Sequence, residues 1–84
     1  MSDVLPGLYR GMVTETNDPD GRGRGRVKVM VPLLSPDAQW AMPCLPYVSG
    51  RTAIDVPPVG TEVWIAFERG NPEVPVWMGV APRL

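Results

Sequence analysis

The stretch EVWIAFERGNPEVPVWMGV, residues 62–80, decides the fold of this 84-residue chain. Its first part alternates, because one face of an extended backbone would carry Val63, Ile65 and Phe67 while the other carries Trp64 and Ala66. The run RGNPE then turns the chain, since proline fixes one backbone angle and glycine permits unusual ones. The run PVWMGV returns, so the stretch predicts strands over 62–68 and 75–80.

Two apolar runs nearer the N-terminus predict a further pair of strands. Residues 8–15 form the first, in which Gly11 marks a bulge or bend. Residues 26–31 form the second and alternate cleanly, with Val27, Val29 and Val31 opposite Arg26, Lys28 and Met30. The turn-forming run NDPDG lies between the two runs, so we expect a hairpin.

The rest of the chain offers one more strand and no helix. Residues 39–45 predict a short, proline-interrupted strand of the edge type, and 47–58 a surface loop. Eleven prolines leave no interval with the length and periodicity of a helix. We therefore predict an all-β fold, a small five-stranded barrel, because closure removes exposed strand edges. The chain would be one domain over 1–84, with an N-terminal extension over 1–7, the barrel over 8–80 and a C-terminal tail over 81–84.

Composition excludes several classes of function. With one cysteine and no histidine, the chain can form no intrachain disulfide and none of the common zinc sites. A formal charge of −1 provides no general attraction to nucleic acid or anionic membranes. No signal peptide or membrane-spanning run is visible, so we expect a soluble protein made in a cytoplasm. A domain this small usually needs additional stabilisation, which leaves oligomerisation or docking on a partner.

Catalytic machinery is not predicted either. There is no histidine to act as a general base or to activate Cys44, which we expect to be buried and inert between Pro43 and Leu45. The aspartates occur in turns or loops, where they are explained as turn formers or surface charges. We expect no enzyme activity, no cofactor and no metal.

Three apolar side chains are candidate contacts with a partner protein: Met30, Trp64 and Trp77. If the valines and the Val63 face fill the interior, Trp64 must face outward, and Met30 with it. Burying a tryptophan against a partner would stabilise a complex by a few kcal/mol at about 25 cal/mol per Å². The alternative is that Trp64 lies under the loop over 47–58.

The run GRGRGR, residues 21–26, is the most unusual local feature. An extended backbone would place Arg22, Arg24, Arg26 and Lys28 along one side as a basic stripe. Three interpretations remain open. The arginines are solvated or pair with Asp18 and Asp20 in a flexible hairpin loop; they contact an acidic groove of a neighbouring protein; or they bind single-stranded nucleic acid.

Three blocks of sequence carry a family resemblance. They are YRGMV at 9–13, followed by the Asp18-Pro19 turn and GRVKVMVP at 25–32; WAMP at 40–43; and PVGTEVWIAFERGNPEVPVWMG at 58–79. In this order they resemble the OB-fold domain of bacteriophage baseplate assembly protein V, which is shared with contractile-tail central spikes and type VI secretion spike proteins. The resemblance covers roughly residues 8–80. The Gly-Arg repeat departs from the family pattern.

The resemblance implies an OB-type barrel and a structural role. Family members build the hub at the end of a tail tube, commonly as a trimer beneath a needle. We therefore expect a non-enzymatic homotrimer in a virion tail baseplate, assembled in the host cytoplasm, that contacts other hub and spike proteins but not membranes or nucleic acid. Because the sequence ends at Leu84, any needle or wall-degrading activity is expected on a separate protein. The alternative is an OB module that binds single-stranded nucleic acid or oligosaccharide.

Overall fold

Strands form close to all five predicted positions. The computed structural model describes residues 4–19, 25–45 and 55–83. Its elements are β1 (Tyr9–Glu15), β2 (Val27–Met30), β3 (Ala38–Pro43), β4 (Glu62–Phe67), a single 3-10 turn η1 (Glu68–Gly70) and β5 (Pro75–Val80). The all-β prediction is therefore confirmed. Among these residues no helix has the length and apolar character needed to cross a bilayer.

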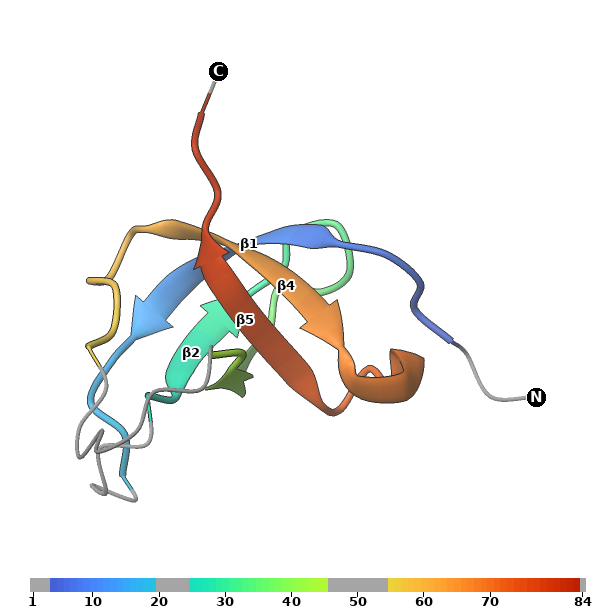
Figure 1. Cartoon of the computed structure of the whole chain (residues 1–84), viewed down its shortest axis with the longest axis horizontal. Coiled ribbons are helices and arrows are strands. Elements are labelled where there is room, and N and C mark those ends of the chain that lie inside the picture. Colours follow the sequence, from blue (N-terminus) through green and yellow to red (C-terminus); the bar gives the residue numbers. More distant parts are fainter. Residues whose placement is uncertain (1–3, 20–24, 46–54, 84) are drawn as a thin grey trace.

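The strands close into a barrel in the order β1-β2-β3-β5-β4 (Figure 1). β1 pairs antiparallel with both β2 and β4, and β4 pairs antiparallel with β5. The short parallel pairing of β3 with β5 completes the circle. The predicted small five-stranded OB-type barrel is thus confirmed.

β3 is not the edge strand that its proline suggested. It pairs antiparallel with β2 over 38–41 and parallel with β5 through Met42–Val76 and Pro43–Trp77. Pro43 is tolerated because it is the last residue of the strand, where its missing N–H interrupts no longer ladder. The next residue restores the contact, since the backbone N–H of Cys44 donates to the carbonyl of Trp77 at 2.9 Å.

The barrel interior contains the side chains that the alternation predicted. The three valines of the 26–31 run and the Val63, Ile65 and Phe67 set are all buried. Val13, Ala41 and Trp77 join them in one cluster. Because the side-chain period of a strand is two, each strand sends every second residue into this single core.

Gly11 is a site of close approach, and the expected bulge lies elsewhere. The register of β1 with β2 shifts between Val13 and Glu15, which places the irregularity at Thr14. At Gly11, an added Cβ would lie 2.8 Å from Cγ1 of Ile65 and 3.2 Å from the carbonyl oxygen of Met30. Glycine is needed there because the side chain of β4 packs directly on the backbone of β1.

The two ends of the barrel are built from different segments. At one end, the turns over 31–37 and 68–74 meet the N-terminal segment, where the Leu5 N–H donates to the Gly70 carbonyl at 2.9 Å. At the other end, residues 81–83 leave the barrel after β5. Figure 1 shows the segments over 4–8 and 81–83 leaving the barrel in different directions.

Candidate protein-binding surface

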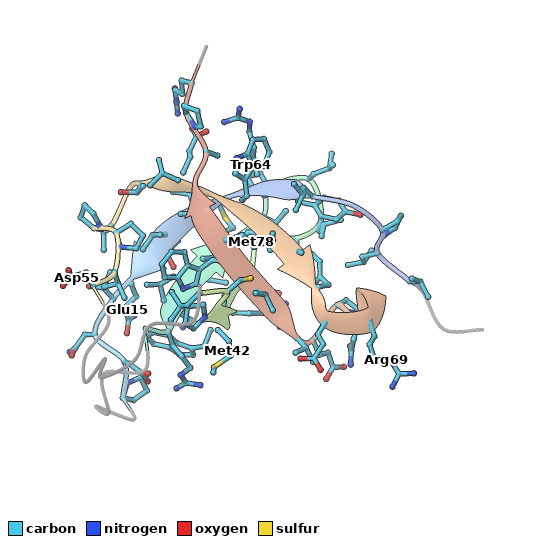
Figure 2. The ribbon with its side chains drawn as sticks, in the orientation of Figure 1. Glu15, Met42, Asp55, Trp64, Arg69 and Met78 are labelled. Carbon is cyan, nitrogen blue, oxygen red and sulfur yellow. The ribbon has the colours of Figure 1, made fainter. Side chains whose placement is uncertain are left out.

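Trp64 lies on the outer face of β4 and is half-buried, as the alternation predicted. Its partner in the register with β1 is Arg10, whose guanidinium carbon lies 4.6 Å from the centre of the indole ring. The cation and the ring face attract each other electrostatically. In Figure 2 Trp64 projects from the barrel on the side where the C-terminal segment leaves. The alternative cover, the loop over 47–58, lies largely outside the described residues.

Arg10 also belongs to a charged cluster with Glu62 and Arg83. One Arg10 nitrogen lies 3.2 Å from Glu62 Oε1, and Arg83 forms an ion pair with the other carboxylate oxygen. The hydrogen bond from Arg83 and its charge, with a smaller contribution from Arg10, hold the pKa of Glu62 below its ordinary value despite partial desolvation. The carboxylate is therefore ionised at neutral pH.

The same cluster fixes the segment that follows β5. Arg10 donates to the carbonyls of Ala81 at 3.4 Å and Pro82 at 3.0 Å. The Ala81 N–H in turn donates to the backbone carbonyl of Glu62 at 2.9 Å. These contacts hold residues 81–83 against β4 and β1 and give the chain a defined direction of exit.

An apolar strip of largely exposed side chains lies on β5 and continues onto β3. We define it as Met42, Val76, Met78 and Val80; the side chains of Met42, Met78 and Val80 are 45%, 44% and 60% exposed, respectively. Met42 and Val76 are direct partners in the β3–β5 register. Figure 2 shows Met78 over β5 and Met42 below it. A run of exposed apolar side chains on adjacent strands is typical of a protein–protein contact.

Trp77 is not on this surface, and its predicted outward position is wrong. The side chain is 7% exposed and packs in the core, while its indole N–H donates to the Gly25 carbonyl at 2.8 Å. Trp77 is the register partner of the buried Ile65 on β4, and paired residues of an antiparallel ladder share a face, so Trp77 must point inward. Its polar N–H is satisfied there, which allows a tryptophan to be buried.

Met30 is on the outer face of β2, as predicted, and is half-buried. Its partner in the register with β1 is Met12, which is also half-buried. The two methionines form an apolar area between β1 and β2, separate from the apolar strip. Met side chains are adaptable, which suits a contact surface.

Of the predicted basic stripe, Arg26 and Lys28 lie within the described residues; Arg22 and Arg24 lie outside them. The guanidinium of Arg26 donates two hydrogen bonds, of 2.9 and 2.6 Å, to the carboxylate of Asp18. Its carbon also lies 5.4 Å from the centre of the Trp40 ring. For this arginine, pairing with Asp18 is therefore the interpretation that holds.

The acidic side chains and the single cysteine bear on metal binding and nucleophilic chemistry. Within residues 4–19, 25–45 and 55–83, no three His, Cys, Asp or Glu side chains gather as a metal site. Cys44 is exposed, contrary to our expectation of a buried thiol. Ala41 and Pro43 lie on the inward-facing side of β3. Cys44 directly follows Pro43, so its side chain lies on the opposite side.

Sequence reasoning missed the charged cluster, the apolar strip and Trp40. Arg10 and Glu62 are 52 residues apart, and no local pattern connects them. The strip did leave a signal, since placing Trp77 inward puts Val76 and Met78, both apolar, on the outer face of β5. Trp40 was visible only as part of the second family block.

A family model described as the type VI secretion system/phage-baseplate injector OB domain matches residues 9–81. This range includes every strand of the barrel. No curated protein matches the chain.

Proposed function

The chain belongs to the type VI secretion system/phage-baseplate injector OB-domain family, and on that premise we propose that it is a non-enzymatic structural component of a baseplate hub or central spike. The apparatus is a phage tail or a related contractile injection machine. The chain acts by assembling with other hub and spike proteins, as a homotrimer, on a particle built in the host cytoplasm. Its family supports a structural role in such an apparatus.

The observation that carries this proposal is the apolar strip on the outside of a closed barrel. Covering a half-exposed methionine or valine stabilises a complex by roughly 1 kcal/mol each, at about 25 cal/mol per Å². Association costs about 4–15 kcal/mol in lost freedom of motion. The strip alone is therefore too small to hold two molecules together, and it favours a multi-chain assembly in which several weak contacts act at once.

A cyclic trimer would provide several such weak contacts at once. In a ring, each subunit presents two different faces, one to each neighbour. The apolar strip provides one face, and the area formed by Met12 and Met30 on β1 and β2 provides a second. The charged cluster at Arg10 and Glu62 would then direct residues 81–83 away from the contact.

Two valines of nearly equal exposure make the test sharp. Val80 in the strip is 60% exposed, and Val59, which lies in the turn before β4 and is not part of the strip, is 61% exposed. Light scattering over a concentration series should show the trimer for the native chain and for Val59→Ser, and a monomer for Val80→Ser. Both variants should keep their stability within about 0.5 kcal/mol. Equal masses for Val80→Ser and Val59→Ser would remove the strip from the interface.

The role in the particle needs a second measurement. Mass spectrometry of purified tails or injection particles from the source of this sequence should find the chain in constant proportion to other baseplate proteins. Particles that lack the chain would contradict the proposal whatever its oligomeric state.

The competing function, a module for single-stranded nucleic acid or oligosaccharide, is tested in solution. The positive charge of Arg26 is paired with the carboxylate of Asp18. Arg26 therefore adds little to any basic surface that it would form with Lys28. Anisotropy with labelled oligonucleotides should show no binding at physiological salt. Tight binding that weakens steeply with salt would favour the competing function instead.

A further inference from the structure

A pocket opens at the end of the barrel formed by the turns over 31–37 and 68–74. Its volume is about 140 Å³. Buried core residues form its floor, among them Val29, Val31 and Phe67, while Leu5 and Leu34 contribute to its walls. The pocket therefore reaches the core of the protein from outside, on a different part of the molecule from the apolar strip.

Two of the three polar side chains that line this pocket, Gln39 and Ser35, form hydrogen bonds within the chain. The Gln39 amide donates to the Pro72 carbonyl at 3.0 Å, across the two turns. The Ser35 hydroxyl oxygen accepts the Asp37 N–H at 3.1 Å. A sugar or a nucleobase would bring many polar groups into a site with few partners for them, which is unfavourable. The interior of the pocket suits an apolar group.

The size of the pocket limits that group to about one side chain. A dry cavity of about 150 Å³ lined by apolar side chains accommodates a benzene molecule. A leucine or phenylalanine side chain is of the same order. Filling the pocket would restore dispersion contacts that its lining otherwise lacks.

Charge around the pocket indicates what accompanies this side chain. Asp37 lines the pocket, and the turn over 68–74 adds Glu68 and Glu73 against the single cation Arg69. Three carboxylates and one guanidinium favour a cationic neighbour and repel phosphate. Nucleic acid is therefore disfavoured at this end of the barrel.

We infer that this end pocket binds one bulky apolar side chain of a partner protein, flanked in that partner by lysine or arginine. The inference rests on the proposed role in assembly, because it names the kind of segment that a neighbouring hub or spike protein presents. Apolar anchors that enter preformed pockets carry much of the binding energy of protein interfaces. A charged flank adds specificity and speeds encounter.

The test uses the full chain and a short peptide, acetyl-Lys-Leu-Lys-amide. Methyl NMR should show saturable shifts at Val29, Val31 and Leu34 with a Kd on the order of 1–10 mM, as expected for a single buried anchor. The same peptide with alanine in place of leucine should leave these methyls unshifted. The peptide with glutamates in place of lysines should bind at least about threefold more weakly at low salt.

Two leucines of the same turn supply matched variants. Leu34 lines the pocket, whereas Leu33 is 82% exposed and does not. Leu34→Ala should lower the affinity for the lysine–leucine peptide by about threefold or more, because it removes part of the pocket wall. Leu33→Ala should bind the peptide like the native chain. Asp37→Asn should reduce the preference for the lysine peptide over the glutamate peptide.

Absence of saturable shifts with the lysine–leucine peptide, or equal shifts with the alanine peptide, would overturn the inference. The experiment separates this failure from a failure of the proposed function, because a monomer can still bind the peptide. Conversely, if the chain trimerises and is found in particles but does not bind the peptide, the structural role would stand and the inference about the pocket would be rejected.

Discussion

The inner and outer faces of the barrel differ in how fully their apolar side chains are packed. Inside, valines, Ile65 and Trp77 pack into one cluster, and within the described ranges no buried side-chain polar atom lacks a hydrogen-bond partner. Outside, most side chains of the apolar strip are exposed. β5 shows the contrast in two adjacent residues, since Trp77 is in the core and Met78 is 44% exposed.

This difference separates two physical tasks. Burial of apolar surface in the interior stabilises the fold, and it does so without a partner. Apolar surface left on the outside contributes nothing until another molecule covers it. Substitutions inside should therefore change the free energy of unfolding, while substitutions outside should change association or the position of the C-terminal segment.

The largest effect is expected from the two tryptophans on opposite sides of the barrel wall. Trp77→Ala should cost about 3–5 kcal/mol, because it removes a buried ring and leaves a cavity. That is close to the whole stability of a domain of this size, about 3–5 kcal/mol, so the variant should be largely unfolded. Trp64→Ala should cost only about 1 kcal/mol. Urea unfolding followed by circular dichroism measures both.

Trp77→Phe serves as the graded control. It keeps most of the ring and removes the N–H that bonds to Gly25, which should cost about 1–3 kcal/mol. A larger loss of stability in Trp64→Ala than in Trp77→Phe would break the distinction between the two faces.

A smaller effect is expected where β1 and β4 touch. Gly11→Ala should destabilise the barrel by about 1–3 kcal/mol, because its Cβ would meet Ile65 and the backbone of β2. Thr14→Ala on the same strand is the control. Its hydroxyl bonds to the Lys28 carbonyl at 3.3 Å in an exposed setting, so its removal should cost about 0.5 kcal/mol or less. Similar denaturation midpoints for the two variants would show that β1 can move away from β4.

The interior was predictable from sequence where the alternation had contrast. In 26–31 and 62–68, most of the residues that alternate with the buried ones are charged or small, as Arg26, Lys28 and Ala66 are, and the buried set follows from the period of two. The run PVWMGV has no such contrast, because both of its faces are apolar. Trp77 was misplaced for that reason, and only the paired strands determine which face is inside.

The surface was less predictable because it depends on distant residues. The parallel pairing of β3 with β5 leaves no local signal, and it brings Met42 beside Val76. The charged cluster joins β1, β4 and residues 81–83. By contrast, Asp18 and Arg26 are close in sequence, and their pairing was among the interpretations that the turn allowed.

The smallest effect on stability is expected when acid protonates Glu62 in the charged cluster on the outer face. The pKa of Glu62 is lowered in the folded protein, so its contacts stabilise the fold above the ordinary carboxyl pKa of 4.5 and are lost as pH falls through the folded value. Global stability should change little, because exposed ion pairs contribute little. The local effect should be clear. Protection of the Ala81 amide against hydrogen exchange, corrected for intrinsic rates, should fall as pH drops below 4.5.

Glu62→Gln distinguishes this mechanism from general acid loosening. The amide cannot form the ion pair with Arg83, so Ala81 protection should be low and nearly independent of pH across the same range. The amide of Ile65, on the same strand but facing the core, should keep its protection in both proteins, because the interior holds no titrating group among the residues described. If Ala81 lost protection equally with acid in Glu62→Gln, the carboxylate would not be what holds the C-terminal segment, and the outer face would depend on the interior after all.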